Sequence, residues 1–152
     1  RKKEELKYNF SISPYIDVSQ KNKLSQNKQA GARKKPERVE GTLSCELPKT
    51  LVKKNDIHIT SKRNFDCFQD TELDMLLKRT LDVKNIIICG VNTDTCVYGT
   101  TFGASNRGYN PIVIECCTGS MRGEDQHKTA LKIMSQSIAW VMKKEEILNK
   151  LN

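Results

Sequence analysis

The chain has 152 residues, of which 37% are hydrophobic and 29% charged, and its net charge is +8. This length suits one domain with a buried core, and no apolar run approaches the ~20 residues of a membrane-spanning helix. No apolar signal-peptide segment follows the charged first residues, and the six cysteines contain no C-x-x-C pair of a zinc or redox site. We therefore expect a soluble, cytoplasmic protein whose cysteines remain reduced.

Residues 1–37 are expected to form a basic, poorly ordered arm. Eleven of the 26 Lys and Arg residues lie within residues 1–40, against five of the 18 Asp and Glu residues. Such a tail could contact nucleic acid or an anionic membrane, but it lacks the interleaved aromatic residues and the fold signature of nucleic-acid binding. Its Lys, Gln, Asn and Ser composition predicts poor order instead, which leaves residues 38–152 as the folded domain.

The first predicted elements of that domain are a strand, a helix and a second strand. A short strand is predicted over residues 56–60, and a helix begins at Thr71, with Asp74 in its first turn. Residues 86–89 form a continuous apolar run that ends at Gly90. Such a run is typical of a strand that is buried on both faces.

A helix is predicted over residues 95–107, with Gly108 at its C-terminal end, and a second buried strand over residues 111–114. His127 lies on the apolar face of the last predicted helix and is expected to pack or to form a helix-end hydrogen bond. The apolar positions of this helix recur at three- and four-residue steps: His127, Ala130, Leu131, Met134, Ile138 and Val141. The alternation of strands and helices predicts an α/β fold, with a parallel sheet flanked by helices on both faces.

Cys96 is the main candidate for chemistry, because it follows the carboxyl end of a predicted strand, where such folds collect their catalytic groups. It also lies in the first turn of a predicted helix. A helix N-terminus carries about half a positive charge and favours a thiolate over a thiol, and its N–H groups can hold an oxyanion. The alternative interpretation is a small apolar residue that fills the turn.

Two segments around this cysteine resemble the isochorismatase-like cysteine hydrolases. Residues 90–97, GVNTDTCV, resemble the nucleophile turn G-V-x-T-x-x-C-V of that family, and residues 62–68, KRNFDCF, resemble its K-x-x-x-x-x-F segment. Residues 106–109 and 120–127 are similar to segments of the branch that includes biuret and ureidoacrylate amidohydrolases. The resemblance covers roughly residues 38–148, and it implies a Rossmann-like, three-layer α/β fold.

The resemblance implies a cysteine-dependent amidohydrolase that hydrolyses the C–N bond of a small amide, ureide or carbamoyl substrate through an acyl-thioenzyme and releases ammonia. Cys96 would be the nucleophile, and Lys62 would stabilise its thiolate and orient the substrate. The backbone N–H groups of Asn92 and Cys96 would form the oxyanion hole, with a cis peptide expected at Val91–Asn92. A homo-oligomer is expected by analogy, with no cofactor and no metal.

Other residues near these motifs have both a functional and a packing interpretation. Phe68 and Tyr98, with Phe65, could line a substrate pocket, although aromatic side chains more often fill a core. Cys116 and Cys117 end a strand, and one of them could face the site. Core packing is their expected role, because a free cysteine behaves as a small hydrophobic residue.

One part of the family's machinery has no clear counterpart. The family uses an Asp at the end of its first strand to accept the thiol proton, and no matching apolar strand occurs before residue 50. Asp17 is the nearest candidate, but it precedes Lys62 by too few residues for the missing elements. The sequence therefore predicts an N-terminally truncated member without the first strand, its helix and the base. The alternative function is a catalytically inactive remnant that serves as a binding or oligomerisation module.

Overall fold

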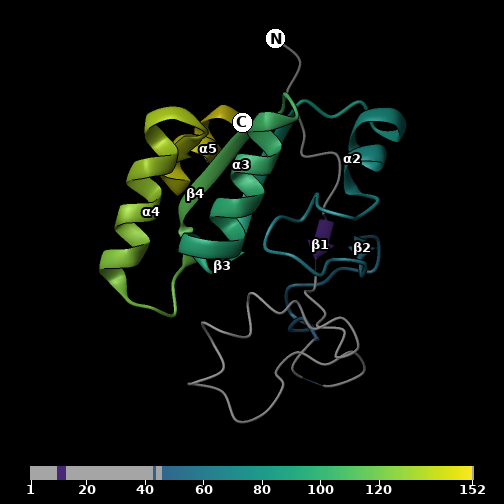
Figure 1. The fold of residues 1–152 in the computed structure, drawn as a ribbon, viewed down its shortest axis with the longest axis horizontal. Coiled ribbons are helices and arrows are strands. Elements are labelled where there is room, and N and C mark those ends of the chain that lie inside the picture. Colours follow the sequence, from purple (N-terminus) through teal and green to yellow (C-terminus); the bar gives the residue numbers. More distant parts are fainter. Residues whose placement is uncertain (1–9, 13–42, 44–45, 152) are drawn as a thin grey trace. The chain divides into compact units, whose positions relative to one another are not determined.

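A computed structural model describes residues 10–12, 43 and 46–151 of the chain (Figure 1). The chain divides into two compact units, Tyr8–Arg63 and a second that contains Asn64–Asn152, and each is described by itself. The expected boundary at residue 37 and the candidate Asp17 lie outside the described residues. Within the described ranges, no helix is both long enough and apolar enough to cross a membrane.

The first unit contains a two-stranded parallel sheet. Strand β2, Ile57–Ile59, lies within the strand predicted over residues 56–60 and is confirmed. Its partner β1, Phe10–Ile12, pairs residue for residue with β2. This strand was not predicted, because three residues are too few for a hydrophobic pattern and the partner lies far along the chain. The segment expected to be a poorly ordered arm therefore contains at least one paired strand.

The second unit is built on a three-stranded parallel sheet in the order β3-β4-β5. Strand β3 is Asn85–Val91, β4 is Asn110–Gly119 and β5 is Trp140–Met142. The predicted strands over residues 86–89 and 111–114 lie within β3 and β4 and are confirmed as strands. The burial expected on both faces is wrong for β3, in which only Ile88 is buried. Together with the flanking helices, this sheet gives the α/β fold that the sequence predicts.

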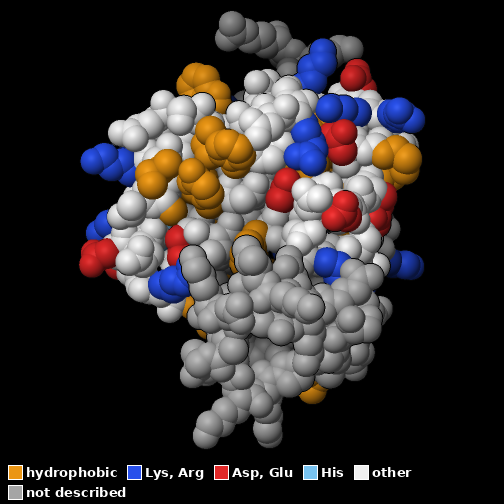
Figure 2. Space-filling model, viewed as in Figure 1, with side chains coloured by type: hydrophobic (Ala, Val, Ile, Leu, Met, Phe, Trp, Pro, Cys, Tyr) orange, Lys and Arg blue, Asp and Glu red, His pale blue; other side chains and the backbone are white. Residues whose placement is uncertain are grey.

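Helices cover this sheet, with α3, Tyr98–Asn106, and α4, Glu124–Ser137, in contact with each other and with β4 (Figure 1). Helix α5, Lys144–Leu151, also contacts β4. The core of the unit is mainly apolar and includes Leu73, Leu77, Ile88, Val97, Ala104, Val113, Ile114, Ala130, Leu131, Met134 and Ile147. On the face shown in Figure 2, hydrophobic side chains also gather over α3 and α4.

The helix predicted from Thr71 is present as a short α-helix, α2 (Leu73–Met75), followed by a π-helical turn, η2 (Leu76–Thr80). The Thr71 hydroxyl accepts a hydrogen bond from the N–H of Leu73 at 3.3 Å and donates one to the carbonyl of Cys67 at 2.6 Å. Asp74 lies in the first turn, as predicted. Thr71 thus fixes the start of the helix on the segment before it.

The last predicted helix is wrong at its C-terminal end. It was expected to include Val141, but α4 ends at Ser137, and Val141 lies in β5, where it pairs with Val113 of β4. Neither Gly nor Pro separates the helix from the strand in the sequence. The three- and four-residue spacing of apolar residues therefore continues beyond Ser137, where the helix ends.

Three cysteines expected in buried strands are exposed: Cys89, Cys116 and Cys117. Cys89 belongs to β3, an edge strand of the sheet that the structure describes, in which only Ile88 is buried. Cys116 and Cys117 lie where the β3–β4 register shifts. The prediction of core packing fails for them because the ladder is irregular at this end of the sheet.

Candidate active site

The turn that carries Cys96 begins directly after β3. The Val91–Asn92 peptide is cis, the isomer that the resemblance implied there. Asn92 is extended, and its carbonyl accepts hydrogen bonds from the N–H groups of Thr95 at 3.1 Å and Val97 at 3.0 Å. A π-helical turn, η3 (Thr93–Val97), then runs into α3. Cys96 is half-buried in this first turn. Because η3 begins at Thr93, the helical segment begins two residues earlier than predicted.

The C-terminal end of α3 is capped at Gly108, as the sequence predicts. Gly108 has a φ of +81°, a backbone conformation that glycine adopts without steric cost. Its N–H donates to the carbonyl of Ser105 at 3.0 Å, and the N–H of Tyr109 donates to the carbonyl of Ala104 at 3.1 Å. These two bonds form a Schellman motif, which satisfies carbonyl groups at the helix end.

One residue of the Cys96 turn bonds to the segment that joins β4 to α4, and another bonds to the first turn of α4. The Oδ1 atom of Asn92 accepts a hydrogen bond from the N–H of Met121 at 3.1 Å. The Oγ1 atom of Thr93, whose residue is fully buried, lies 2.8 Å from Nδ1 of His127. The sequence assigned His127 to packing or to a helix-end hydrogen bond, and its partner in the Cys96 turn was missed.

Asp94, the next residue of the turn, makes the shortest of these contacts. Its Oδ1 accepts a 2.6 Å hydrogen bond from the Ser120 hydroxyl, and its Oδ2 pairs with the Arg122 guanidinium at 2.6 Å. Partial removal from water opposes ionisation of this carboxyl, but the bonds from Ser120 and Arg122 outweigh that effect and hold the pKa of Asp94 below its usual range. We call residues 120–127 the turn clamp, because they bind three successive residues that precede Cys96.

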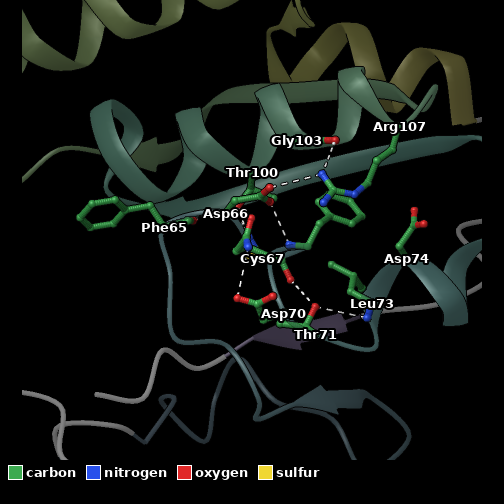
Figure 3. A network of polar contacts seen from close by, with 12 residues as sticks. Phe65, Asp66, Cys67, Asp70, Thr71, Leu73, Asp74, Thr100, Gly103 and Arg107 are labelled. Carbon is green, nitrogen blue, oxygen red and sulfur yellow. Dashed lines mark hydrogen bonds and ion pairs between the residues drawn. The ribbon is translucent and has the colours of Figure 1, made fainter. Parts of the chain in front are cut away.

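The segment after Lys62 is fixed on α3 by a second polar network (Figure 3). The N–H of Cys67 donates to Oγ1 of Thr100 at 3.1 Å, and the Thr100 hydroxyl lies 3.3 Å from the carbonyl of Phe65. The Arg107 guanidinium pairs with Asp66 at 3.3 Å and donates to the carbonyl of Gly103 at 3.0 Å. These contacts hold residues 65–67 along one side of α3.

Small residues allow this segment to approach α3 closely. A methyl group added at Gly103 would overlap the carboxylate of Asp66, whereas one added at Gly99 would lie 3.5 Å from its nearest neighbours, which is ordinary contact. Gly103 is therefore required for the position of Asp66. Asp66 in turn accepts the N–H of Phe68 at 2.8 Å, so the network also sets where Phe68 lies.

Phe68 is a packing residue in this unit. Only 4% of it is exposed, and its ring stacks on Tyr109 with centroids 5.5 Å apart. The Arg107 guanidinium lies 5.0 Å from the centre of the same ring. Of the two interpretations of Phe68, these contacts favour packing in the core. Tyr98 is half-buried at the start of α3, and its expected contact with substrate stays a prediction.

The predicted pair of Cys96 and Lys62 is divided between the two units. Lys62 is 3% exposed and belongs to the unit Tyr8–Arg63, whereas Cys96 belongs to the other. The approach of the ammonium to the thiol therefore stays a prediction. Within the described part of the chain, no group of three or more His, Cys, Asp or Glu residues is arranged to hold a metal ion.

Residues 13–146 match the family described as the Isochorismatase domain. The chain is 33% identical over 97 residues to an uncharacterised isochorismatase family protein of Escherichia coli O157:H7, covering 64% of this chain and 50% of that protein. Over 105 residues it is 28% identical to a second such protein, of Bacillus subtilis, covering 69% and 54%. The chain spans about half the length of these curated relatives.

Two solved structures have a fold similar to that of this chain. An isochorismatase-like hydrolase from Alkaliphilus metalliredigens superposes with a TM-score of 0.81 at 21% identity, over 95% of this chain and 74% of that one. A nicotinamidase from Staphylococcus aureus superposes with a TM-score of 0.62 at 29% identity, over 68% of each chain. The first likeness concerns the fold alone, and the second is closer in sequence.

Proposed function

The chain belongs to the isochorismatase domain family, and we propose that it is a cysteine-dependent amidohydrolase acting on a small amide, ureide or carbamoyl compound. The observation that carries this proposal is the placement of Cys96. It lies in the first helical turn after the carboxyl end of a parallel strand, in a turn fixed by the turn clamp. The likeness to a nicotinamidase supports an amide as the substrate class.

In the proposed reaction, the Cys96 thiolate attacks the substrate carbonyl carbon and forms a tetrahedral intermediate. The N–H groups of Asn92 and Cys96 hold its oxyanion, and the Lys62 ammonium stabilises the thiolate before attack. The proton that leaves the thiol ends on the departing nitrogen, so ammonia is released as the C–N bond breaks. Water then hydrolyses the thioester, which yields the acid and restores the thiol.

The slowest part of this scheme is expected to be proton transfer. The family's acid–base Asp has no counterpart that the sequence resemblance identifies, and general acid–base groups typically contribute about 10²–10⁴ in rate. We therefore expect slow turnover. Complete absence of turnover with a folded chain would favour the alternative function, an inactive binding or oligomerisation module.

The test is ammonia release from a panel of small carboxamides, ureides and carbamoyl compounds. We expect release with at least one compound, and loss of that release in Cys96→Ala. Cys116→Ala is the matched control, because it removes an exposed thiol outside the Cys96 turn and should leave the rate unchanged. Equal rates for the Cys96→Ala variant and the native chain would contradict the proposal.

A further inference from the structure

Three thiols lie together at the carboxyl end of the sheet, outside the Cys96 turn. Cys89 belongs to β3, whereas Cys116 and Cys117 belong to β4. Between the paired positions on either side of this point, β3 advances by two residues and β4 by five. The additional residues of β4 form a bulge, which places two β4 thiols opposite one β3 thiol.

Cys117 lies next to both of the other cysteines. Gly90 of β3 pairs with Thr118 of β4, so Cys89 and Cys117, the residues directly before them, are neighbours across the two strands, and the sulfur atoms of Cys117 and Cys116 are 4.0 Å apart. Partial removal from water, followed by the influence of Cys117, raises the pKa of Cys89 to about 11. The pKa of Cys117 is also raised, first by removal from water and then by Cys116, and the cation of Lys144 opposes this shift.

These contacts argue against the two ordinary uses of clustered cysteines. All three residues are exposed, so they do not fill a core. Nor are they arranged to hold a metal ion, as noted for the described part of the chain. Exposed, reduced and adjacent thiols can instead be oxidised to a disulfide.

We propose that Cys89 and Cys117 form a reversible disulfide across β3 and β4, with a small-molecule disulfide such as glutathione disulfide as the oxidant. Cys117 is the partner of Cys89 because the two residues directly precede the paired residues Gly90 and Thr118 and are therefore neighbours on adjacent strands. A bond between Cys116 and Cys117 would have to close a small ring that includes the peptide bond between these consecutive residues. A disulfide between Cys89 and Cys117 would close no such ring.

The chemistry takes place in two exchange steps. One thiolate of the pair attacks a sulfur of glutathione disulfide, forming a mixed disulfide and releasing one glutathione thiolate. The other thiolate attacks the protein sulfur of the mixed disulfide, which forms the Cys89–Cys117 bond and releases the second glutathione. The two thiol protons pass to the released glutathione molecules through solvent, so two protein thiols are oxidised and one glutathione disulfide is reduced.

This site has a characteristic response to pH. Because thiolates are the attacking species, a raised thiol pKa makes exchange slow at neutral pH and faster as the pH rises. For the same reason, the reduced pair gains little from ionisation, which favours the disulfide once it has formed. The bond also joins the end of β3 to β4 immediately before the Val91–Asn92 peptide, and it should raise the unfolding temperature of the chain by several degrees.

The experiment treats the 152-residue Cys96→Ala chain with glutathione disulfide, digests it with trypsin without reduction and maps the products by tandem mass spectrometry. The Cys96→Ala background matters because Cys89 and Cys96 share the tryptic peptide 85–107, whereas Cys116 and Cys117 share peptide 108–122. We expect these two peptides to be cross-linked, to separate on reduction, and to form more rapidly at higher pH.

Two further variants in this background identify the bond. The cross-link should persist in Cys116→Ala and disappear in Cys117→Ser, and circular dichroism confirms that each variant is folded. The proposal is overturned if the oxidised chain carries only separate glutathione adducts, or if it contains a Cys116–Cys117 bond within peptide 108–122. It is also overturned if all three thiols remain free in excess oxidant. None of these outcomes depends on whether the chain hydrolyses an amide.

Discussion

The Oγ1 atom of Thr93 lies 2.8 Å from the Nδ1 atom of His127, and this contact joins the Cys96 turn to the first turns of α4. Thr93 is fully buried, so its hydroxyl needs a partner within the protein. His127 provides it from a helix 34 residues further along the chain. The relationship makes His127 a positioning residue for the proposed nucleophile.

Replacement of His127 by Ala should slow alkylation of Cys96 by about fivefold, because one hydrogen bond contributes about 1 kcal/mol. His127→Asn should restore most of the rate, since its amide group can reach the position of Nδ1. The measurement is the iodoacetamide labelling rate of Cys96, mapped by mass spectrometry, with Cys116 as the internal control. A slower rate at both cysteines would indicate a general change of structure and contradict the specific role.

The ion pair of Asp94 and Arg122 should make part of the stability depend on acid pH. Because the folded-state pKa of Asp94 is depressed, its stabilising contribution is present above the ordinary carboxyl pKa of about 3.9 and is lost as the pH falls through the folded value. We expect Arg122→Met to lower the free energy of unfolding at neutral pH. The difference from the native chain should shrink below about pH 3.9.

Urea unfolding at a series of pH values measures this difference. Lys128→Met is the matched control, because it removes an ion pair with Glu124 in which both side chains are largely exposed, and such pairs contribute about 0–1 kcal/mol. If the effect of Arg122→Met were independent of pH down to strong acid, the ionised Asp94 would not be its cause.

Gly103→Ala should destabilise the chain by about 1–3 kcal/mol, the usual cost of inserting a group into a filled space. The added methyl group would overlap the Asp66 carboxylate and displace residues 65–67 from α3. Gly99→Ala, one turn earlier on the same helix, introduces only ordinary contacts and should be neutral or stabilising by up to about 1 kcal/mol. Equal unfolding free energies for the two variants would contradict the close approach at Gly103.

Tyr109→Phe should cost about 1 kcal/mol, because it removes one hydrogen bond and leaves the ring in place. The Tyr109 hydroxyl donates to the Asp74 carboxylate at 2.8 Å, and burial followed by this neighbour raises its pKa. The ring should continue to stack on Phe68. In urea unfolding, Asp74→Asn should be milder, because it keeps an acceptor for the hydroxyl; a larger loss than in Tyr109→Phe would argue against the bond.

Periodicity and helix-end signals were enough to predict much of the second unit. The continuous apolar runs located β3 and β4, and Gly108 correctly marked the end of α3. Strands β1 and β5 were missed because each has three residues, too few for a pattern, and each is defined by its pairing partner. Pairing of this kind depends on contacts between distant segments, which a local pattern does not contain.

The candidate site was only partly visible in the sequence. The resemblance located Cys96 and the cis peptide before it, since both belong to one continuous motif. The turn clamp was missed because its bonds join residues 92–94 to residues 120–127, and a single sequence gives no sign of which polar side chains will meet. The exposed thiols were misjudged for a similar reason, because the register shift of β4 follows from its pairing with β3.

The central claim is that Cys96 is an activated nucleophile, and the most direct test is its alkylation by limiting iodoacetamide across a range of pH. We predict that the half-buried Cys96 reacts faster at neutral pH than the exposed Cys116. The ratio of the Cys96 rate to the Cys116 rate should fall above about pH 8.5, where an ordinary thiol ionises. The same ratio should be smaller in Lys62→Met. If Cys96 reacts no faster than Cys116 at any pH in the folded native chain, it is not an activated nucleophile.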